Sequence, residues 1–294
     1  MARIVACGEA MLELSREGSG WRLGHGGDVL NMAIHLARAG HDAALLTALG
    51  NDAFAAGMTA AWQAEGLDCS LVLSHSARTT GLYAIEVDAH GERSFTYWRD
   101  TSAAREMFAL PAMTGARARV AGADLLVFSL ISLAVLPDAG REALLALAGE
   151  VRASGGRVAF DGNYRARLWP SVVEARHWRD RAIALADIGL PTLDDESALG
   201  LSDAEAVARH WQGLGCAETV VKLGAEGCRL PDGALLAPPD RLQPVDTSGA
   251  GDAFDAGYLA ARLDGAAPRE AALAGHALAG WTIMRPGACP ARFP

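Results

Sequence analysis

The sequence lacks an excess of basic residues: 26 lysines and arginines stand against 35 aspartates and glutamates, for a net charge of −9. Surfaces that bind nucleic acid need such an excess, so we expect no nucleic-acid partner. Long apolar runs are also missing. The longest, 125–136, is interrupted by Ser129 and Ser132 and falls short of the roughly 20 residues that span a bilayer. We expect it to form a buried strand followed by a loop, with no membrane partner.

Other absences narrow the class further. The first ten residues contain too little apolar sequence for a signal peptide, so we expect a cytoplasmic protein. The five cysteines are scattered, with no CxxC pair and no neighbouring histidine, which predicts reduced, mostly buried thiols rather than a zinc site. Neither GxxxxGK[ST] nor a GxGxxG after the first strand is present, which argues against a P-loop and against a nicotinamide-dependent dehydrogenase.

What the sequence does contain is a regular alternation of strand and helix patterns. Apolar runs at 3–8, 42–50, 123–129, 156–161, 187–190 and 218–224 predict strands. Helical patterns follow at 28–40, 53–65, 137–153 and 171–186, and another begins at Asp203. This order predicts an α/β fold with a mostly parallel central sheet and helices on both faces. Repeats and proline-rich linkers are absent, so we expect a single domain over 1–294.

Two segments depart from this rhythm, "EAMLELSREGSGWRLG" and "GLYAIEVDAHGERSFTYW". The second alternates apolar and polar residues around "DAHGE", which is typical of a β-hairpin. We expect the regions near 9–25 and 80–101 to form a small β-sheet lid on the α/β body. Its exposed apolar side chains in "RSFTYW" predict a homo-oligomer, a dimer or higher.

The turn Gly249-Ala250-Gly251 precedes a helical pattern whose first turn contains Asp252. Uncovered amides at a helix N-terminus attract anions, and a carboxylate beside them is placed to deprotonate an attacking hydroxyl. A helix start capped by Thr247 or Ser248, with an acidic first turn, is an equally ordinary reading of these residues. The turn alone leaves both readings open.

Three motifs carry a resemblance to a known family. "DTSGAGDAFDAGYLA", "GGDVLNMAIHLARAG" and "VVKLGAEG" are similar, in this order, to the signatures of the ribokinase-like (PfkB) carbohydrate kinases. The resemblance covers nearly the whole chain and implies a ribokinase-like fold, ATP as phosphoryl donor and Mg²⁺. It also implies that Asp252 is the catalytic base and that Gly249, Ala250 and Gly251 form the anion hole.

Within the family, "GERSFTYWRDTSAARE", "GLY", "DGNYRARLW" and "TLDDESAL" resemble the kinases that phosphorylate the 6-hydroxyl of 2-dehydro-3-deoxygluconate. The resemblance implies a sugar-acid substrate contacted by Gly27, Asp28, Asn31, Tyr83, Tyr97, Arg99 and Arg165. A guanidinium group suits a carboxylate, so the two arginines are the expected partners of the acid. The galactonate epimer, a neutral sugar such as fructose or ribose, and a noncatalytic sugar sensor stay as alternatives.

For the nucleotide, the resemblance points to Asn163, Lys222, Gly224 and Gly227, together with the amides of 249–252. Many relatives carry Asn-x-x-Glu near the metal, whereas the matching stretch here is Leu193-Asp194-Asp195-Glu196, without asparagine. Glu196 is the expected organiser of metal-bound water, and an acidic helix start is the alternative. A requirement for a monovalent cation stays open.

Overall fold

The computed structural model describes residues 1–87 and 93–291. Its central sheet has the strand order β11-β10-β9-β8-β1-β4-β5, and every neighbouring pair is parallel. The strands are β1 (Arg3–Cys7), β4 (Asp42–Gly50), β5 (Val72–His75), β8 (Leu125–Ser129), β9 (Arg157–Asp161), β10 (Ile188–Gly189) and β11 (Glu218–Thr219). The expected parallel α/β architecture is confirmed.

Helices cover both faces of this sheet. One face packs against α3 (Met113–Val120), α4 (Leu130–Val135), α5 (Asp138–Ala153), α6 (Val172–Ile183) and α8 (Ala204–Gly213). The other packs against α1 (Asp28–Arg38), α2 (Ala53–Ala64), α9 (Ala250–Leu263) and α10 (Pro268–Ile283). The short helices are α7 (Leu193–Ala198), η1 (Ala103–Ala109), η2 (Ala166–Leu168) and η3 (Gly224–Glu226).

The alternation of side chains along buried strands explains the two cores. In β1, Val5 packs into one core and Ile4 into the other, and Phe128 and Val127 of β8 divide in the same way. A strand buried on both faces needs apolar residues at every position, because successive side chains point to opposite faces. This is why these strands are continuous apolar runs in the sequence.

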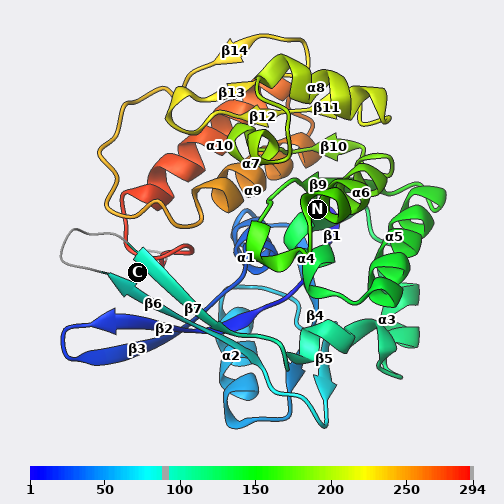
Figure 1. Cartoon of the computed structure of the whole chain (residues 1–294), viewed down its shortest axis with the longest axis vertical. Helices are drawn as coiled ribbons and strands as arrows, with labels where there is room; N and C mark the ends of the chain where they lie inside the picture. Colours follow the sequence, from blue (N-terminus) through cyan, green and yellow to red (C-terminus); the bar gives the residue numbers. More distant parts are fainter. Residues whose placement is uncertain (88–92, 292–294) are drawn as a thin grey trace.

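The lid is a separate four-stranded sheet in the order β3-β2-β6-β7. It consists of β2 (Met11–Glu17), β3 (Gly20–Gly26), β6 (Gly81–Val87) and β7 (Arg93–Trp98), and it projects from the helical body at the lower left of Figure 1. Strands β6 and β7 pair antiparallel, as a hairpin requires. The expected turn "DAHGE", 88–92, lies outside the described residues.

A third sheet lies beside α8, α9 and α10 (Figure 1). It has the order β12-β13-β14, with β12 (Val221–Lys222), β13 (Cys228–Arg229) and β14 (Leu235–Leu236). Strand β12 and η3 contain the "VVKLGAEG" segment. No helix in the described ranges is long and apolar enough to cross a membrane.

One expectation from the sequence is wrong. The residues after β8 form a helix, α4, and not a loop. Ser129 accepts a hydrogen bond from the amide of Ser132 at 3.1 Å, and the Ser132 hydroxyl accepts one from the amide of Ser129 at 3.1 Å. This reciprocal capping satisfies amides at the helix start, so the two serines that interrupt the apolar run begin a helix there.

Candidate active site

One cavity of about 1740 Å³ contains most of the residues that the sequence pointed to. It lies at the carboxyl ends of the central strands, where Asp161 ends β9 and Thr192 follows β10, and the inner face of the lid forms another wall. Ligands of open parallel sheets bind at this edge, because the loops there are free to carry polar groups. The cavity is large enough for two ligands side by side.

The glycine turn forms the N-terminus of α9. Gly249 is the residue before the helix, with φ +69°, and a Cβ there would lie 2.3 Å from the carbonyl oxygen of Ala288. Only glycine fits this position. No side chain caps the helix, so the reading in which Thr247 or Ser248 covers the first amides is not realised. Ala250 and Gly251 line the cavity beside the helix start, where an anion is favoured.

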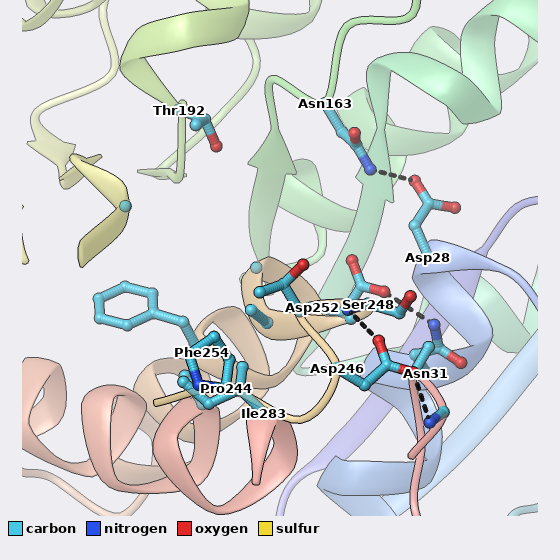
Figure 2. A pocket seen from close by; sticks show the side chains of 18 of the residues that line it. Asp28, Asn31, Asn163, Thr192, Pro244, Asp246, Ser248, Asp252, Phe254 and Ile283 are labelled. Carbon is cyan, nitrogen blue, oxygen red and sulfur yellow. Dashed lines mark hydrogen bonds between the residues drawn. The ribbon is translucent and has the colours of Figure 1, made fainter. Parts of the chain in front are cut away.

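Asp252 lies in the first turn of α9 and is 9% exposed. Its Oδ2 accepts a hydrogen bond of 2.8 Å from the amide Nδ2 of Asn31 on α1 (Figure 2). Burial raises the pKa of Asp252 to about 7 and the negative charge of Asp28 adds to this rise, whereas the Asn31 hydrogen bond lowers it. A carboxyl with a pKa near neutrality accepts a proton more readily than an ordinary aspartate does.

Asp28 begins α1 opposite Asp252. Its Oδ2 accepts a hydrogen bond from the Ser129 hydroxyl at 2.5 Å. It also accepts one from Asn163 Nδ2 at 3.2 Å (Figure 2). Burial raises the pKa of Asp28 as well. The resemblance assigned Asn163 to the nucleotide and Asp28 to the sugar, and the structure brings the two side chains together at the centre of the cavity.

Steric crowding also explains why the residue before α1 is a glycine. Gly27 has φ +153°, and a Cβ there would lie 2.5 Å from the carbonyl oxygen of Glu9. The segment between β1 and β2 therefore approaches the residue before α1 closely, and the start of α1 lines the cavity.

The lid contributes a pair of stacked tyrosines. Tyr83 on β6 lies opposite Tyr97 on β7 in the strand register, and their ring centroids are 5.7 Å apart. The Tyr83 hydroxyl donates a hydrogen bond to the carboxylate of Glu13 on β2. Both tyrosines line the cavity, and Glu13 is a lining residue that the sequence analysis did not single out.

Each of the two expected arginines has a carboxylate partner. Arg99 is 8% exposed and forms a buried ion pair with Glu9. Arg165 is exposed; its Nη1 lies 3.3 Å from Asp195 Oδ1 and donates to the Tyr164 carbonyl at 2.7 Å. Both arginines line the cavity. Their positive charges are nevertheless balanced by Glu9, which the sequence analysis did not single out, and by Asp195, which it noted only as part of the stretch 193–196.

Lys222 lies between two buried aspartates. Its Nζ is 3.0 Å from Asp161 and 2.8 Å from Asp255. Burial opposes the ammonium charge, but both carboxylates favour it, and the net effect raises the pKa of Lys222. The carboxyl end of β9 and the spacing of Asp255 three residues after Asp252 are signals that both aspartates lie near the site, but neither signal pairs them with Lys222.

The turn after Lys222 is tight. Gly224 and Gly227 have φ values of +60° and +102°, and a Cβ on Gly227 would lie 2.0 Å from the Leu236 carbonyl oxygen. Both glycines line the cavity. The wall of the cavity also contains residues from the segment before α9 and from α9 and α10, which the sequence analysis did not predict. They include Pro244, Phe254, His276, Gly280 and Ile283, of which Figure 2 labels Pro244, Phe254 and Ile283.

Glu196 is not brought into the cavity. Its side chain is fully buried, 2.6 Å from Arg179 Nη1 and 3.1 Å from Trp211 Nε1. The neighbouring Asp194 and Asp195 line the cavity instead, and burial raises the pKa of Asp195 to about 6. Within residues 1–87 and 93–291, no three His, Cys, Asp or Glu side chains gather as a metal site. Hard carboxylate oxygens at Asp194 and Asp195 fit Mg²⁺, which keeps water and phosphate ligands.

Comparison with known proteins shows which family the chain resembles. The model of the "pfkB family carbohydrate kinase" matches residues 1–293. The chain is 41% identical over 297 residues to the 2-dehydro-3-deoxygluconokinase of Escherichia coli (strain K12), covering 97% of this chain and 96% of that protein. It is 42% identical over 296 residues to the protein of the same name from Dickeya dadantii (strain 3937), covering 97% and 96%.

A solved structure agrees with the fold. The aminoimidazole riboside kinase of Salmonella enterica, complexed with aminoimidazole riboside and an ATP analogue, superimposes with a TM-score of 0.82. That comparison covers 98% of this chain and 95% of that one, at 26% sequence identity. The ribokinase-like architecture expected from the motifs is therefore confirmed.

Proposed function

The chain belongs to the pfkB family of carbohydrate kinases, and from this membership we propose that it phosphorylates 2-dehydro-3-deoxy-D-gluconate. The products are 2-dehydro-3-deoxy-6-phosphogluconate and ADP. Membership makes the chain an ATP-using carbohydrate kinase. The choice of a sugar acid rests on the relatives named for that substrate, at 41% and 42% identity over 97% of the chain.

The observation that carries the proposed chemistry is the position of Asp252. Its carboxyl lies at the N-terminus of a 14-residue helix, beside the amides of Ala250 and Gly251, and its pKa is raised to about 7. In the proposed step, the carboxylate accepts the proton of the 6-hydroxyl while the hydroxyl oxygen bonds to the γ-phosphorus. The bond from that phosphorus to the bridging oxygen breaks, and ADP leaves with the bond's electron pair.

The residues around Asp252 have supporting roles in this proposal. Asn31 holds the Asp252 carboxylate, and Asp28 and Asn163 form the adjoining wall. The amides of 249–252 stabilise charge on the transferred oxygens. Mg²⁺ bound near Asp194 and Asp195 would neutralise phosphate charge. Gly224 and Gly227 allow the turn after Lys222 to pass close to the nucleotide without side chains in between. Glu196 holds α7 in position and does not contact the metal.

The acceptor lies, in this proposal, between the start of α1 and the lid. Gly27 allows close approach, Asp28 and Asn31 accept or donate hydrogen bonds to hydroxyls, and Tyr83 and Tyr97 cover the sugar. A lid over the acceptor excludes water, which would otherwise compete for the phosphoryl group. The motifs imply that Arg99 and Arg165 bind the carboxylate of the acceptor.

One observation favours a second candidate, a neutral sugar as acceptor. Glu9 and Asp195 balance the charges of Arg99 and Arg165, so those two arginines offer little net attraction for an acid. Release of ADP, followed by a coupled spectrophotometric assay, separates the candidates. We expect turnover with 2-dehydro-3-deoxygluconate or its galactonate epimer to exceed that with gluconate, fructose and ribose. If fructose or ribose is phosphorylated as fast as the sugar acids, the acceptor is a neutral sugar and the proposal is wrong. If no acceptor leads to ADP release, the protein is a sugar sensor.

We also propose that the outer face of the lid joins two copies of the chain. Strand register places Leu23 and Trp21 of β3 on the same face as Trp98 of β7, and these three side chains are 51%, 44% and 55% exposed. Exposed apolar side chains on one sheet face are typical of an interface. Light scattering after size exclusion should give a dimer or higher, and a monomer at micromolar concentration would contradict this.

A further inference from the structure

The cavity contains an arginine that none of the motifs assigns. Arg167 lies in the three-residue turn η2 and lines the cavity two residues after Arg165. Its guanidinium carbon is 3.8 Å from the centroid of the Tyr97 ring on the lid. The turn is held from both sides, because Tyr164 and Trp169 are buried at 5% and 7% exposure.

Charge distinguishes Arg167 from its two neighbours. Arg99 is paired with Glu9 and Arg165 with Asp195, whereas Arg167 has no carboxylate or hydrogen-bond partner among the described residues. The Arg99 guanidinium is also close to the Tyr97 ring, at 5.5 Å. Because Glu9 neutralises Arg99, Arg167 is the arginine of this group whose charge is uncancelled beside the ring.

The guanidinium carbon of Arg167 lies over the Tyr97 ring, a contact that needs none of its N–H groups as hydrogen-bond donors. A guanidinium that stacks face-on against an aromatic ring keeps its N–H groups in the plane of the fork, where they point away from the ring. Two of these N–H groups match the two oxygens of a carboxylate. Stacking on Tyr97 therefore orients the fork without occupying its donors.

The position of Arg167 also suits the far end of the acceptor. Tyr83 is close enough to Asp252 for that carboxyl's charge to raise the Tyr83 pKa, and Tyr97 stacks on Tyr83. Arg167 follows as the next contact in this series. In 2-dehydro-3-deoxygluconate, the carboxylate and the 6-hydroxyl are at opposite ends of the carbon chain.

On these grounds we propose that Arg167, oriented by the Tyr97 ring, is the residue that binds the carboxylate of the acceptor and selects sugar acids over neutral sugars. This proposal rests on the proposed function. It assigns Arg99 and Arg165 to shaping the wall, and it makes Tyr97 a positioning residue for Arg167.

The test compares two acceptors that differ only at C1. 2-Dehydro-3-deoxygluconate has a carboxylate there, and 3-deoxy-D-fructose has a hydroxymethyl group on the same carbon chain. We expect Arg167→Gln to lower kcat/KM for the acid about 10- to 100-fold, mainly through KM, which is the usual contribution of a charged hydrogen-bonded pair. For 3-deoxy-D-fructose the change should stay below about threefold.

Tyr97 provides a second arm of the test. Tyr97→Leu removes the ring beneath the guanidinium and should reduce the preference for the acid, whereas Tyr97→Phe keeps the ring and should retain it. The double variant with Arg167→Gln should lose no further preference, because both changes disable the same contact. The matched control is Arg181→Gln, which removes an arginine stacked on Trp178 at 4.7 Å, outside the cavity; both substrates should react as before.

The outcomes are separable. If wild-type enzyme phosphorylates the acid and Arg167→Gln leaves the preference unchanged, the assignment of Arg167 is overturned while the proposed function stands. Equal losses for acid and neutral acceptor would make Arg167 merely structural and overturn it as well. A wild-type enzyme that phosphorylates only neutral sugars would overturn both proposals before any variant is made.

Discussion

The pH dependence of turnover tests the environment of Asp252. Burial raises the pKa of this carboxyl from 3.8 to about 7, and the charge of Asp28 contributes to the rise. A rise of about 3 pKa units corresponds to ~4 kcal/mol of disfavoured ionisation. With both substrates below their KM, the rate follows the ionisation of the free enzyme, and a general base acts only as the carboxylate. We expect about a tenfold increase in rate from pH 6 to pH 8, levelling off above.

Two substitutions should move this pH profile in opposite directions. Asp28→Asn removes a negative charge that raises the pKa of Asp252, so the midpoint should fall. Asn31→Ala removes a hydrogen bond that lowers it, so the midpoint should rise. Absolute rates should fall in both, because both residues are proposed acceptor contacts, and the midpoint is therefore the quantity to compare. Asp138→Asn, which changes a side chain that is 81% exposed outside the cavity, is the control with an unmoved midpoint.

The substitution of Asp252, the proposed base, completes the experiment. Asp252→Asn should abolish the rise with pH and lower kcat by roughly 10² to 10⁴, with a smaller effect on KM. A wild-type rate that stays level from pH 6 to pH 8 would refute the argument, since it would mean an ordinary aspartate pKa. Shifts of the two neighbouring variants in the same direction would refute the assigned causes. Near-wild-type turnover of Asp252→Asn would remove this residue from the role of base.

Three further predictions concern stability and affinity. Because the folded-state pKa of Asp252 exceeds its unfolded value, ionisation destabilises the fold progressively as pH rises from about 4 to about 7. Asp252→Asn should therefore be more stable than wild type by ~1–4 kcal/mol at pH 8 and equal to it near pH 4, by calorimetry; an equal difference at both would contradict this. Arg99→Ala and Arg165→Ala should each raise KM for the acid less than Arg167→Gln does, because Glu9 and Asp195 already balance their charges. Only Arg99→Ala should also lower Tm, since it leaves Glu9 buried and unpaired; a larger rise of KM in either than in Arg167→Gln would make that arginine the partner of the carboxylate. Glu196→Gln should lower the free energy of unfolding by ~3–5 kcal/mol, because it breaks the buried ion pair with Arg179. The Mg²⁺ dependence of ADP release should stay unchanged. A changed Mg²⁺ dependence at an unaltered Tm would show that Glu196 acts on the metal.

Local sequence signals predicted much of the fold because they act over a few residues. Ser171 and Asp203 accept hydrogen bonds from the amides of Glu174 and Ala206, as residues at the start of a helix do. The same kind of signal was present in Ser129 and Ser132, which are spaced as a capping pair. Their apolar surroundings favoured the reading as a strand with a loop, and the six-residue α4 is too short to show helical periodicity.

The partners of charged residues could not be predicted in this way. Glu9 and Arg99 are 90 positions apart, and Lys222 meets Asp255 across 33 positions. Nothing in the local sequence distinguishes such a pair from two solvated surface charges. Apart from Glu196, the residues that the motifs indicated line the cavity, yet which arginine keeps its charge depends on tertiary contacts. Arg167 was overlooked because only its stack on Tyr97 separates it from a surface arginine.

The distribution of charge determines how an acidic acceptor would be oriented. Asp28, Asp161 and Asp252 line the cavity at the proposed reacting end, and Lys222 forms ion pairs with Asp161 and with the buried Asp255. A carboxylate placed there would lose its water next to like charges, which is strongly unfavourable. At the other end, Arg167 offers an uncancelled guanidinium. In the proposed complex, these charges would favour the acid group toward the lid and the 6-hydroxyl toward Asp252. The contacts proposed to select a sugar acid would then also determine which hydroxyl is phosphorylated.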